Sequence, residues 1–270
     1  MTESDLTKIA FVGDYLPRKC GIATFTHDLS GAVARASSAQ CVVVPVDDIA
    51  GGYDYSSEVS FQISEEDLDA YRRAADYLNF SNVDVISLQH EFGIFGGLGG
   101  SHILAFLRDI RIPVVTTLHT VLSKPDATQR RVMEQLTELS TRLVVMTQRS
   151  RETLCQTYAV PESKVDLIAH GIPDSAYADP SEFKEQFGVE GRQVALTFGL
   201  LSPNKGIEYV LKAIPEVTGE FPDFVYLILG ATHPSLVRSE GERYRISLER
   251  MAKELGITKN VSFYNRFVEL

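Results

Sequence analysis

Residues able to bind anions or move protons gather in the loops that follow the apolar runs of this sequence. His90, His119 and His170 each come at the end of such a run. Two glycine-containing loops, residues 13–22 and 89–100, hold comparable positions. In open α/β sheets, ligands bind beyond the carboxyl ends of the strands. We therefore expect these histidines and loops to line one ligand site.

The first loop places two cations at the start of a predicted helix. Arg18 and Lys19 precede Gly21 and Ile22, and the backbone N–H groups at a helix N-terminus attract anions. The loop predicts a site for an anion or for hydroxyl groups, with an ordinary turn that uses Gly21 for its geometry as the alternative. The dinucleotide fingerprint GxGxxG is absent, because Pro17 interrupts the loop.

The second loop and the next strand end offer polar groups of other kinds. Gly96 and Gly97 belong to a glycine-rich stretch that either cradles a ligand or is a flexible surface loop, and it lacks the GK[ST] of a Walker A loop. His90 and Glu91 do not continue to HExxH, so no metal site is expected. His119 ends an apolar strand, and this position predicts a functional role rather than a purely structural one.

A further cation lies late in the chain. Asn204, Lys205 and Gly206 open a predicted helix after a turn that contains Pro203. A lysine there adds a point charge to the positive end of the helix, which favours a phosphate group. A solvated surface lysine is the alternative.

The segments between these residues alternate between short apolar strands and amphipathic helices. Such alternation is typical of parallel βαβ units, with helices on both faces of a twisted sheet. The pattern predicts strands at 9–13, 41–46, 59–63, 83–88, 113–118, 143–146, 165–169, 194–198, 225–229 and 261–264. It predicts helices at 22–36, 65–78, 101–110, 126–140, 149–158, 205–219 and 244–255, with Ser101 as an N-cap.

The segment 171–180 divides the pattern into two α/β domains. It holds Pro173 and Pro180 with small and acidic residues between them, which indicates a linker. We predict an N-terminal domain over 1–175 and a C-terminal domain over 190–270. The second domain has about three strands and stops just after one of them, and parallel sheets are normally buried on both faces. We therefore expect it to be incomplete and the sequence to be a fragment, with a naturally short domain as the alternative.

Composition limits the classes of protein to consider. The chain has 270 residues, 44% of them hydrophobic, and a net charge of −10, which is globular and argues against a nucleic-acid binder. No stretch is long and apolar enough to span a membrane, and the N-terminus is acidic and polar. Three cysteines without CxxC spacing fit neither a disulfide scaffold nor structural zinc. We expect a cytoplasmic protein; peripheral membrane contact and the oligomeric state stay open.

Several of these motifs together resemble a known family. The stretch 198–206, Phe-Gly-Leu-Leu-Ser-Pro-Asn-Lys-Gly, looks like the start of the donor-binding domain of the family 4 (group 1) retaining glycosyltransferases, whose usual motif is G-R-L-x-x-x-K-G. The segment 166–173 is similar to their interdomain crossover, and Leu118-His119-Thr120 resembles the strand-end histidine motif of their first domain. Gln89-His90-Glu91 and the loop 17–22 also fit, so the resemblance covers nearly the whole chain.

The resemblance implies an α/β fold of the GT-B type, with two Rossmann-like parallel-sheet domains facing a cleft. It implies metal-independent transfer of a sugar, with retention of anomeric configuration, from a UDP-, GDP- or ADP-sugar to a carbohydrate or lipid-linked acceptor, without a further cofactor. Lys205 matches the family lysine and His119 the histidine near the donor sugar, so these two are the expected catalytic residues. Gly21, Ile22, Arg18, Lys19, Asn204 and Gly206 would serve the donor phosphates, and His90, Glu91, Gly96 and Gly97 the acceptor or sugar.

Two departures from the family pattern bear on activity. Leu200 stands where the motif has its arginine, and Arg18 or Lys19 is the candidate replacement for that charge. The acidic donor-binding motif and the C-terminal helix of the family would lie beyond Leu270, so we expect the chain alone to be inactive.

Two other functions stay open at this point. One is another GT-B enzyme, either an epimerase or a glycan phosphorylase. The other is a non-catalytic module that binds a nucleotide-sugar. Neither the donor base, nor the donor sugar, nor the acceptor is readable from the sequence.

Overall fold

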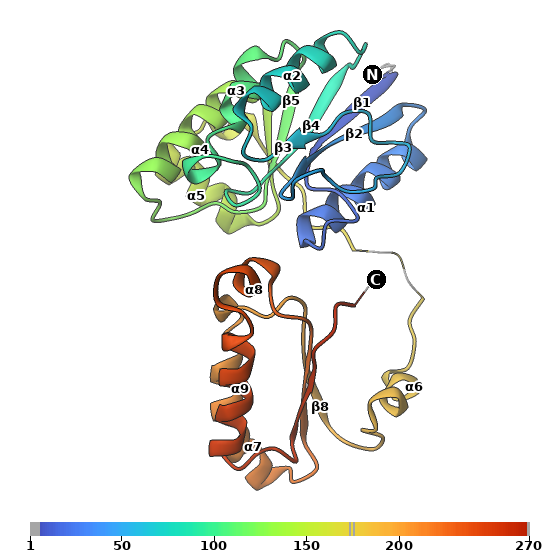
Figure 1. Cartoon of the computed structure of the whole chain (residues 1–270), viewed down its shortest axis with the longest axis vertical. Coiled ribbons are helices and arrows are strands. Elements are labelled where there is room, and N and C mark those ends of the chain that lie inside the picture. Colours follow the sequence, from blue (N-terminus) through green and yellow to red (C-terminus); the bar gives the residue numbers. More distant parts are fainter. Residues whose placement is uncertain (1–5, 173, 175, 269–270) are drawn as a thin grey trace. The chain divides into compact units, whose positions relative to one another are not determined.

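The computed structural model describes residues 6–172, 174 and 176–268. The chain divides into two compact units, Met1–Asp174 and Ser175–Leu270, each with its own sheet (Figure 1). All strand pairs in both sheets are parallel. The α/β class predicted from the sequence is therefore confirmed.

The sheet of the first unit has seven strands and one reversal of strand order. In chain order its strands are β1 (Lys8–Gly13), β2 (Gln40–Asp47), β3 (Ile63–Ser64), β4 (Val85–His90), β5 (Val114–Leu118), β6 (Arg142–Val145) and β7 (Val165–Leu167). The spatial order is β3-β2-β1-β4-β5-β6-β7. The order reverses between β1 and β4, and ligands of open α/β sheets bind at such a switch point.

The helices of this unit cover the two faces of the sheet unequally. They are α1 (Gly21–Ala36), α2 (Leu68–Asn79), α3 (Ile103–Asp109), α4 (Ala127–Leu139) and α5 (Gln148–Tyr158). Ala10 and Val12 of β1 pack in the core formed with α2 to α5. Ile9 and Phe11, which alternate with them, pack against α1 on the opposite face (Figure 1). The strand β1 is thus buried from both sides, as a central parallel strand should be.

The second unit is smaller. Its strands β8 (Val194–Phe198), β9 (Val225–Leu229) and β10 (Val261–Tyr264) lie in the order β10-β9-β8. Its helices are α6 (Pro180–Lys184), α7 (Ile207–Glu220), α8 (Pro234–Glu240) and α9 (Arg243–Glu254). Residues of α7 and α9 form a core with Tyr226 and Ile228 of β9. On the other face, Leu196 and Phe198 of β8 stay 55% and 44% exposed.

Local capping explains where several elements begin. The helix predicted from 65 begins at Leu68, because Asp67 accepts the N–H of Asp69 as its N-cap. Ser101 is not an N-cap: a 3₁₀ turn, Leu98–Gly100, comes first and α3 begins at Ile103. The strand predicted at 59–63 is reduced to β3, with Val59 in a single bridge to Val43.

The structure also differs from the prediction in one strand boundary and in two short helices. The strand predicted at 83–88 runs two residues later, so Gln89 and His90 lie inside β4. The short helices α6 and α8 were not predicted. Of the predicted linker, Pro173 and Ser175 lie outside the described residues.

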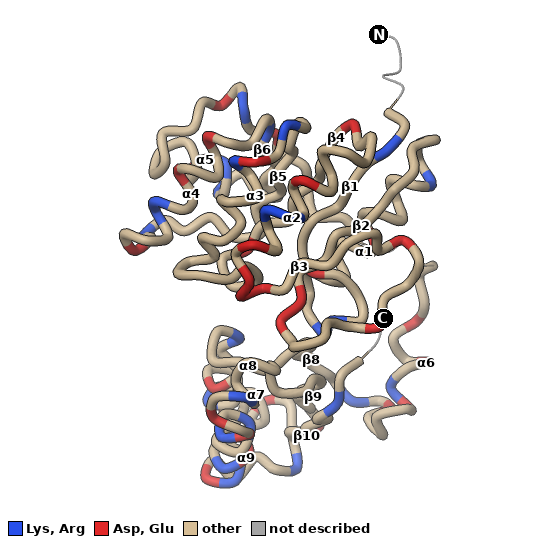
Figure 2. Tube along the Cα trace, turned by 45° about the horizontal axis from the view of Figure 1, so that its top comes forward, with Lys and Arg blue, Asp and Glu red and all other residues tan. Residues whose placement is uncertain are grey.

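Charged residues of both signs are interspersed over each unit (Figure 2). Many form local pairs, such as Arg245 of α9 with Glu242 at 2.9 Å and with Glu249 at 2.5 Å. Such pairs at the surface contribute little to stability. They do show that positive charge is offset locally, in keeping with the net charge of −10.

Candidate functional site

In the first unit, the candidate site is built on the carboxyl ends of β4 and β5. The His119 N–H donates to the His90 carbonyl at 3.0 Å, which holds the two strand ends together. The His119 Nε2 atom lies 3.0 Å from the Gln89 Oε1 atom. The Gln89 Nε2 atom in turn donates to the Ser87 hydroxyl at 3.0 Å. His119 is therefore tied to β4 through both its backbone and its ring.

Helix α1 completes the surroundings of His119. Phe25 of α1 meets the His119 ring edge-on with ring centroids 4.8 Å apart, and meets His170 at 5.0 Å. Burial, and after it the nearby His170, lowers the pKa of His119 to about 4. The imidazole of His119 is therefore neutral near pH 7, able to accept at one nitrogen and donate at the other.

The N-terminus of α1 leaves Gly21 accessible. Its N-cap residue, Cys20, makes no standard side-chain cap, but its thiol interacts with the backbone N–H groups of Ile22 and Ala23. Gly21 is exposed and has no atom within 4 Å of the place where a Cβ would lie. Ile22 packs against the core of the unit. The loop thus offers an exposed backbone surface at Gly21, anchored by Ile22.

Glu91 holds the loop that follows β4. Its carboxylate accepts the N–H of Phe92 at 2.9 Å and the hydroxyl proton of Thr120. The residues that follow His90 and His119 in the chain are therefore joined as well. This second link fixes the loops after β4 and β5 relative to each other.

His90 lies below this surface. Its side chain has no exposed area, and neither ring nitrogen has a hydrogen-bond partner. The ring stacks on Phe95 and meets Phe92 edge-on. Burial lowers the pKa of His90 to about 3. In this structure His90 fills the core beneath the loop.

The buried, neutral His90 predicts a specific dependence of stability on pH. Its folded-state pKa is below the usual value of about 6.5, so the unfolded chain binds the proton first as pH falls. The stabilisation is full above about pH 6.5 and declines as pH falls toward 3. At pH 5 the loss amounts to about 2 kcal/mol. Replacing His90 by leucine removes this loss and an unpaired buried donor.

This pH dependence is checked by denaturant unfolding of wild type and His90→Leu, each at about pH 7.5 and about pH 5. We expect the difference in unfolding free energy to move in favour of the variant by about 2 kcal/mol at the lower pH. Asp14 titrates in both proteins and cancels in the comparison. Ile86→Val, a buried change in the same strand, is the control and should show no such shift. A pH-independent difference for His90→Leu would contradict the assignment.

The glycine-rich stretch after β4 is a packed turn. Gly96 is buried, and a Cβ there would lie 1.9 Å from the Glu65 carbonyl oxygen. Its N–H donates to the Tyr71 hydroxyl at 3.0 Å. Gly97 is exposed, with φ +78°. Of these two residues, Gly97 alone offers surface to a ligand.

Arg18 is engaged by carboxylates of its own unit. Its guanidinium lies 2.8 Å from Asp14, 3.6 Å from Asp48 and 3.6 Å from Glu65, and its side chain is only 11% exposed. Burial raises the pKa of Asp14 to about 7 even with Arg18 beside it. Arg18 therefore neutralises an acidic cluster, whereas Lys19 is exposed. The adjacent Cys20 thiol has its pKa raised to about 11, first by burial, so it is not a reactive thiolate.

In the second unit, the candidate site lies where β8 and β9 end. Lys205 and Asn204 belong to a 3₁₀ turn, and α7 begins after it at Ile207, not at Lys205. Gly206 is the N-cap, with φ +63° and no side chain to close the end of the helix. Lys205 is exposed. A cation and the open N-terminus of a 14-residue helix thus lie side by side.

Two glycines at the strand ends, to which the sequence analysis gave no separate role, shape this end of the sheet. A Cβ on Gly230 would lie 1.9 Å from the Gly199 carbonyl oxygen, and one on Gly199 would lie 3.9 Å from the Lys205 Nζ atom. The loops are also joined by backbone bonds, Leu201 N–H to Ala231 at 2.8 Å among them. The signal available in sequence was that each glycine directly follows an apolar strand.

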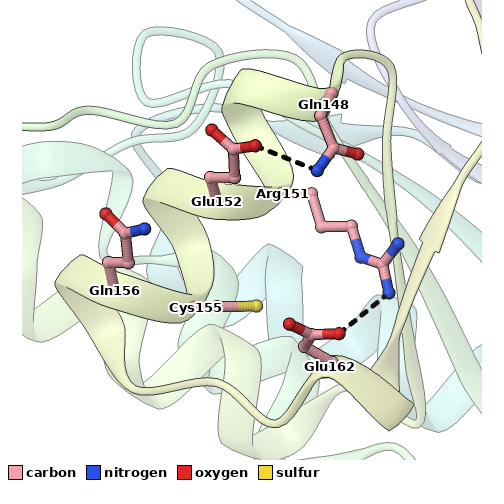
Figure 3. A pocket seen from close by; sticks show the side chains of 6 residues that line it. All are labelled: Gln148, Arg151, Glu152, Cys155, Gln156 and Glu162. Atoms are coloured by element: carbon pink, nitrogen blue, oxygen red, sulfur yellow. Dashed lines mark hydrogen bonds and ion pairs between the residues drawn. The ribbon is translucent and has the colours of Figure 1, made fainter.

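A separate hollow of about 150 Å³ runs beside α5 (Figure 3). Arg151 bonds Glu162 across it at 3.3 Å, and Gln148 bonds Glu152 at 3.0 Å. Burial raises the pKa of its thiol, Cys155. Four of the six lining residues are engaged in these two bonds, and the Arg151 Nε atom is buried without a partner.

Over the part of the chain that the structure describes, no group of three or more His, Cys, Asp or Glu side chains is arranged to hold a metal ion. None of the described helices is long and apolar enough to cross a membrane.

Family models match both units of the chain. The model described as Glycosyltransferase Family 4 matches residues 20–176, more than half of the sequence. The chain belongs to glycosyltransferase family 4. The model described as Glycosyl transferases group 1 matches residues 179–268. The family assignment made from Lys205, His119 and the crossover is thereby confirmed.

Individual relatives of this family member are distant. It is 28% identical over 167 residues to the D-inositol 3-phosphate glycosyltransferase of Segniliparus rotundus, covering 57% of this chain and 36% of the relative. It is 26% identical over 201 residues to an uncharacterized glycosyltransferase of Methanocaldococcus jannaschii, covering 69% of this chain and 47% of that one. The chain thus spans less than half the length of these two curated relatives.

A solved structure shares the fold of this glycosyltransferase family member. The Anabaena protein HepE, crystallised in complex with UDP, matches with a TM-score of 0.69 at 15% identity. The match covers 95% of this chain and 68% of that one. It confirms the GT-B type of α/β fold, with two Rossmann-like units of which the second is smaller.

Proposed function

We propose that the protein is an enzyme that transfers a sugar from a nucleotide-sugar to a carbohydrate or lipid-linked acceptor, with retention of anomeric configuration. The observation that carries the proposal is Lys205 beside the uncapped N-terminus of α7, in the stretch matched by the group 1 family model. A departing nucleoside diphosphate develops negative charge. A lysine and oriented N–H groups stabilise such charge without a divalent metal.

The surroundings of Leu200 and Arg18 indicate which residues could stabilise that charge. Leu200 is half-buried and cannot supply the charge of the motif arginine. Arg18 is bound by three carboxylates within the first unit, which argues against its service to a phosphate. We propose that Lys205, with the N–H groups at the start of α7, carries the diphosphate, and that Asn204 and Gly206 shape its turn.

The first unit would supply the acceptor side of the reaction. His119 presents a neutral imidazole, Gly21 begins α1, and Glu91 and Gly97 lie in the loop after β4. Neutral groups suit contacts with sugar hydroxyls, which need both donors and acceptors. We propose that His119 contacts the transferred sugar, while the nucleotide is bound by the second unit.

Two further features belong to this proposal. All three cysteines are free thiols, which supports a reducing compartment such as the cytoplasm. The known partner of HepE in its crystal is UDP, and the S. rotundus relative is named for an inositol phosphate. A nucleotide donor and a hydroxyl-bearing acceptor therefore suit this chain.

A thermal-shift screen against UDP-, GDP- and ADP-sugars tests the proposal. A donor present at about 100 times its Kd stabilises the folded state by about 2.7 kcal/mol, so one nucleotide series should stand apart from the others. Turnover of that donor then separates a transferase from a module that only binds. No stabilisation by any of the three series would contradict a nucleotide-sugar function.

A further inference from the structure

Gln89 is a buried polar residue to which the proposed reaction assigns no role so far. Its side chain has no exposed area, so it cannot contact an acceptor or a donor directly. Both ends of its amide are used: Oε1 lies 3.0 Å from His119 Nε2, and Nε2 lies 3.0 Å from Ser87 Oγ. Gln89 therefore connects β4 to the histidine at the end of β5.

The packing around Gln89 restricts which residue can stand at position 13. A Cβ on Gly13, at the end of β1, would lie 2.9 Å from the Gln89 Cβ and 3.3 Å from its carbonyl oxygen. Any larger residue at position 13 would push against Gln89. The position of Gln89 is thus set from one side by Gly13 and from the other by the pairing of β4 with β5.

The orientation of the Gln89 amide decides which nitrogen of His119 carries the proton. With Nε2 of Gln89 donating to Ser87, its Oε1 atom faces His119 and can only accept. A neutral imidazole placed against an acceptor carries its proton on Nε2, which leaves Nδ1 as the acceptor of the ring.

We propose that Gln89 is a positioning residue that holds His119 in its Nε2-protonated tautomer and fixes the plane of its ring. The catalytic consequence rests on the proposed function: His119 would meet a sugar hydroxyl with Nδ1 as an acceptor. The tautomer itself does not depend on that function.

The other groups around His119 agree with a neutral ring. Phe25 packs edge-on against it, and His170 and His90 are its titratable neighbours. The carboxylate of Glu91 is bonded to Thr120 and to the Phe92 N–H. The Gln89 side chain bonds the His119 ring. Removing its amide should therefore let the ring adopt either neutral tautomer.

Nitrogen-15 NMR of the 270-residue chain tests this without any assay of activity. In wild type, we expect the His119 Nε2 signal at the protonated position and Nδ1 at the unprotonated one. In Gln89→Met, which keeps the shape and loses the acceptor, we expect a mixture of tautomers. In Gln89→Glu, the added carboxylate should raise the pKa of His119 by about 1 to 3 units.

Controls separate this effect from general disturbance. Thr120→Val breaks a bond of the adjacent residue and should leave the His119 tautomer unchanged. Ser87→Ala removes the group that orients the amide, and should weaken the tautomer preference even if Gln89→Glu does not fold. An Nδ1-protonated ring in wild type, or an unaltered tautomer in Gln89→Met, would overturn the proposal.

Activity gives a second, separate reading. In the protein's natural full-length form, Gln89→Met should lower kcat roughly tenfold with little change in KM for the donor. An altered tautomer with undiminished kcat would leave the role of Gln89 toward His119 standing. That result would instead count against His119 in the proposed reaction.

Discussion

Replacing Lys205 by alanine is expected to lower kcat about a hundredfold, equivalent to about 3 kcal/mol of lost transition-state stabilisation. Lys205 lies beside the open end of α7, where the leaving diphosphate would gather negative charge. The side chain is exposed and packs in no core cluster. Its removal should therefore leave the melting temperature nearly unchanged.

Steady-state kinetics of the natural full-length form, with the donor found in the screen, measure this effect. Lys212→Ala provides the matched control, because Lys212 lies on α7, is also exposed, and has its ammonium group over the Tyr209 ring at 5.7 Å. That variant should retain full activity. If Lys205→Ala turned over normally, the diphosphate would have to be stabilised elsewhere.

Replacing His119 by alanine should lower kcat by roughly a hundredfold while the Kd for the nucleotide changes less than about twofold. The two effects separate because His119 belongs to the first unit and the proposed nucleotide site to the second. Turnover and isothermal titration with the nucleoside diphosphate provide the two measurements.

His27→Ala is the comparison for His119. His27 lies on α1, is exposed, and bonds the Tyr15 hydroxyl at 3.0 Å rather than the His119 ring. It should leave both constants unchanged. An equal fall in nucleotide affinity and turnover on loss of His119 would place the donor nucleotide on the first unit and contradict the proposed division of roles.

The order of elements was predictable because each strand is a short apolar run and each helix has a regular apolar face. The first and last residues of each strand and helix were harder to predict, because tertiary contacts set them. In β4 the pairing with β5 continues through Gln89 and His90, which moved both residues from a predicted loop into the sheet. That shift explains why sequence reasoning placed His90 at the surface of a pocket and overlooked the buried amide of Gln89.

Charge partners distant in sequence were the second source of difference. Arg18 beside Lys19 suggested a phosphate site, since the sequence gives no sign that Asp48 and Glu65 fold back onto Arg18. Lys205 was easier to place, because a turn with proline before a helix and a glycine after the lysine are local signals. The close approach of Gly199 and Gly230 was again a tertiary feature.

The most direct test of the proposed reaction is proton NMR of that reaction as it proceeds, with the natural full-length form, its donor and an acceptor. We expect the first glycosidic linkage to appear to have the same anomeric configuration as the donor sugar, with nucleoside diphosphate released in equal amount. A first-formed product of the opposite configuration would contradict retention, and a donor that binds but is never consumed would contradict glycosyl transfer itself.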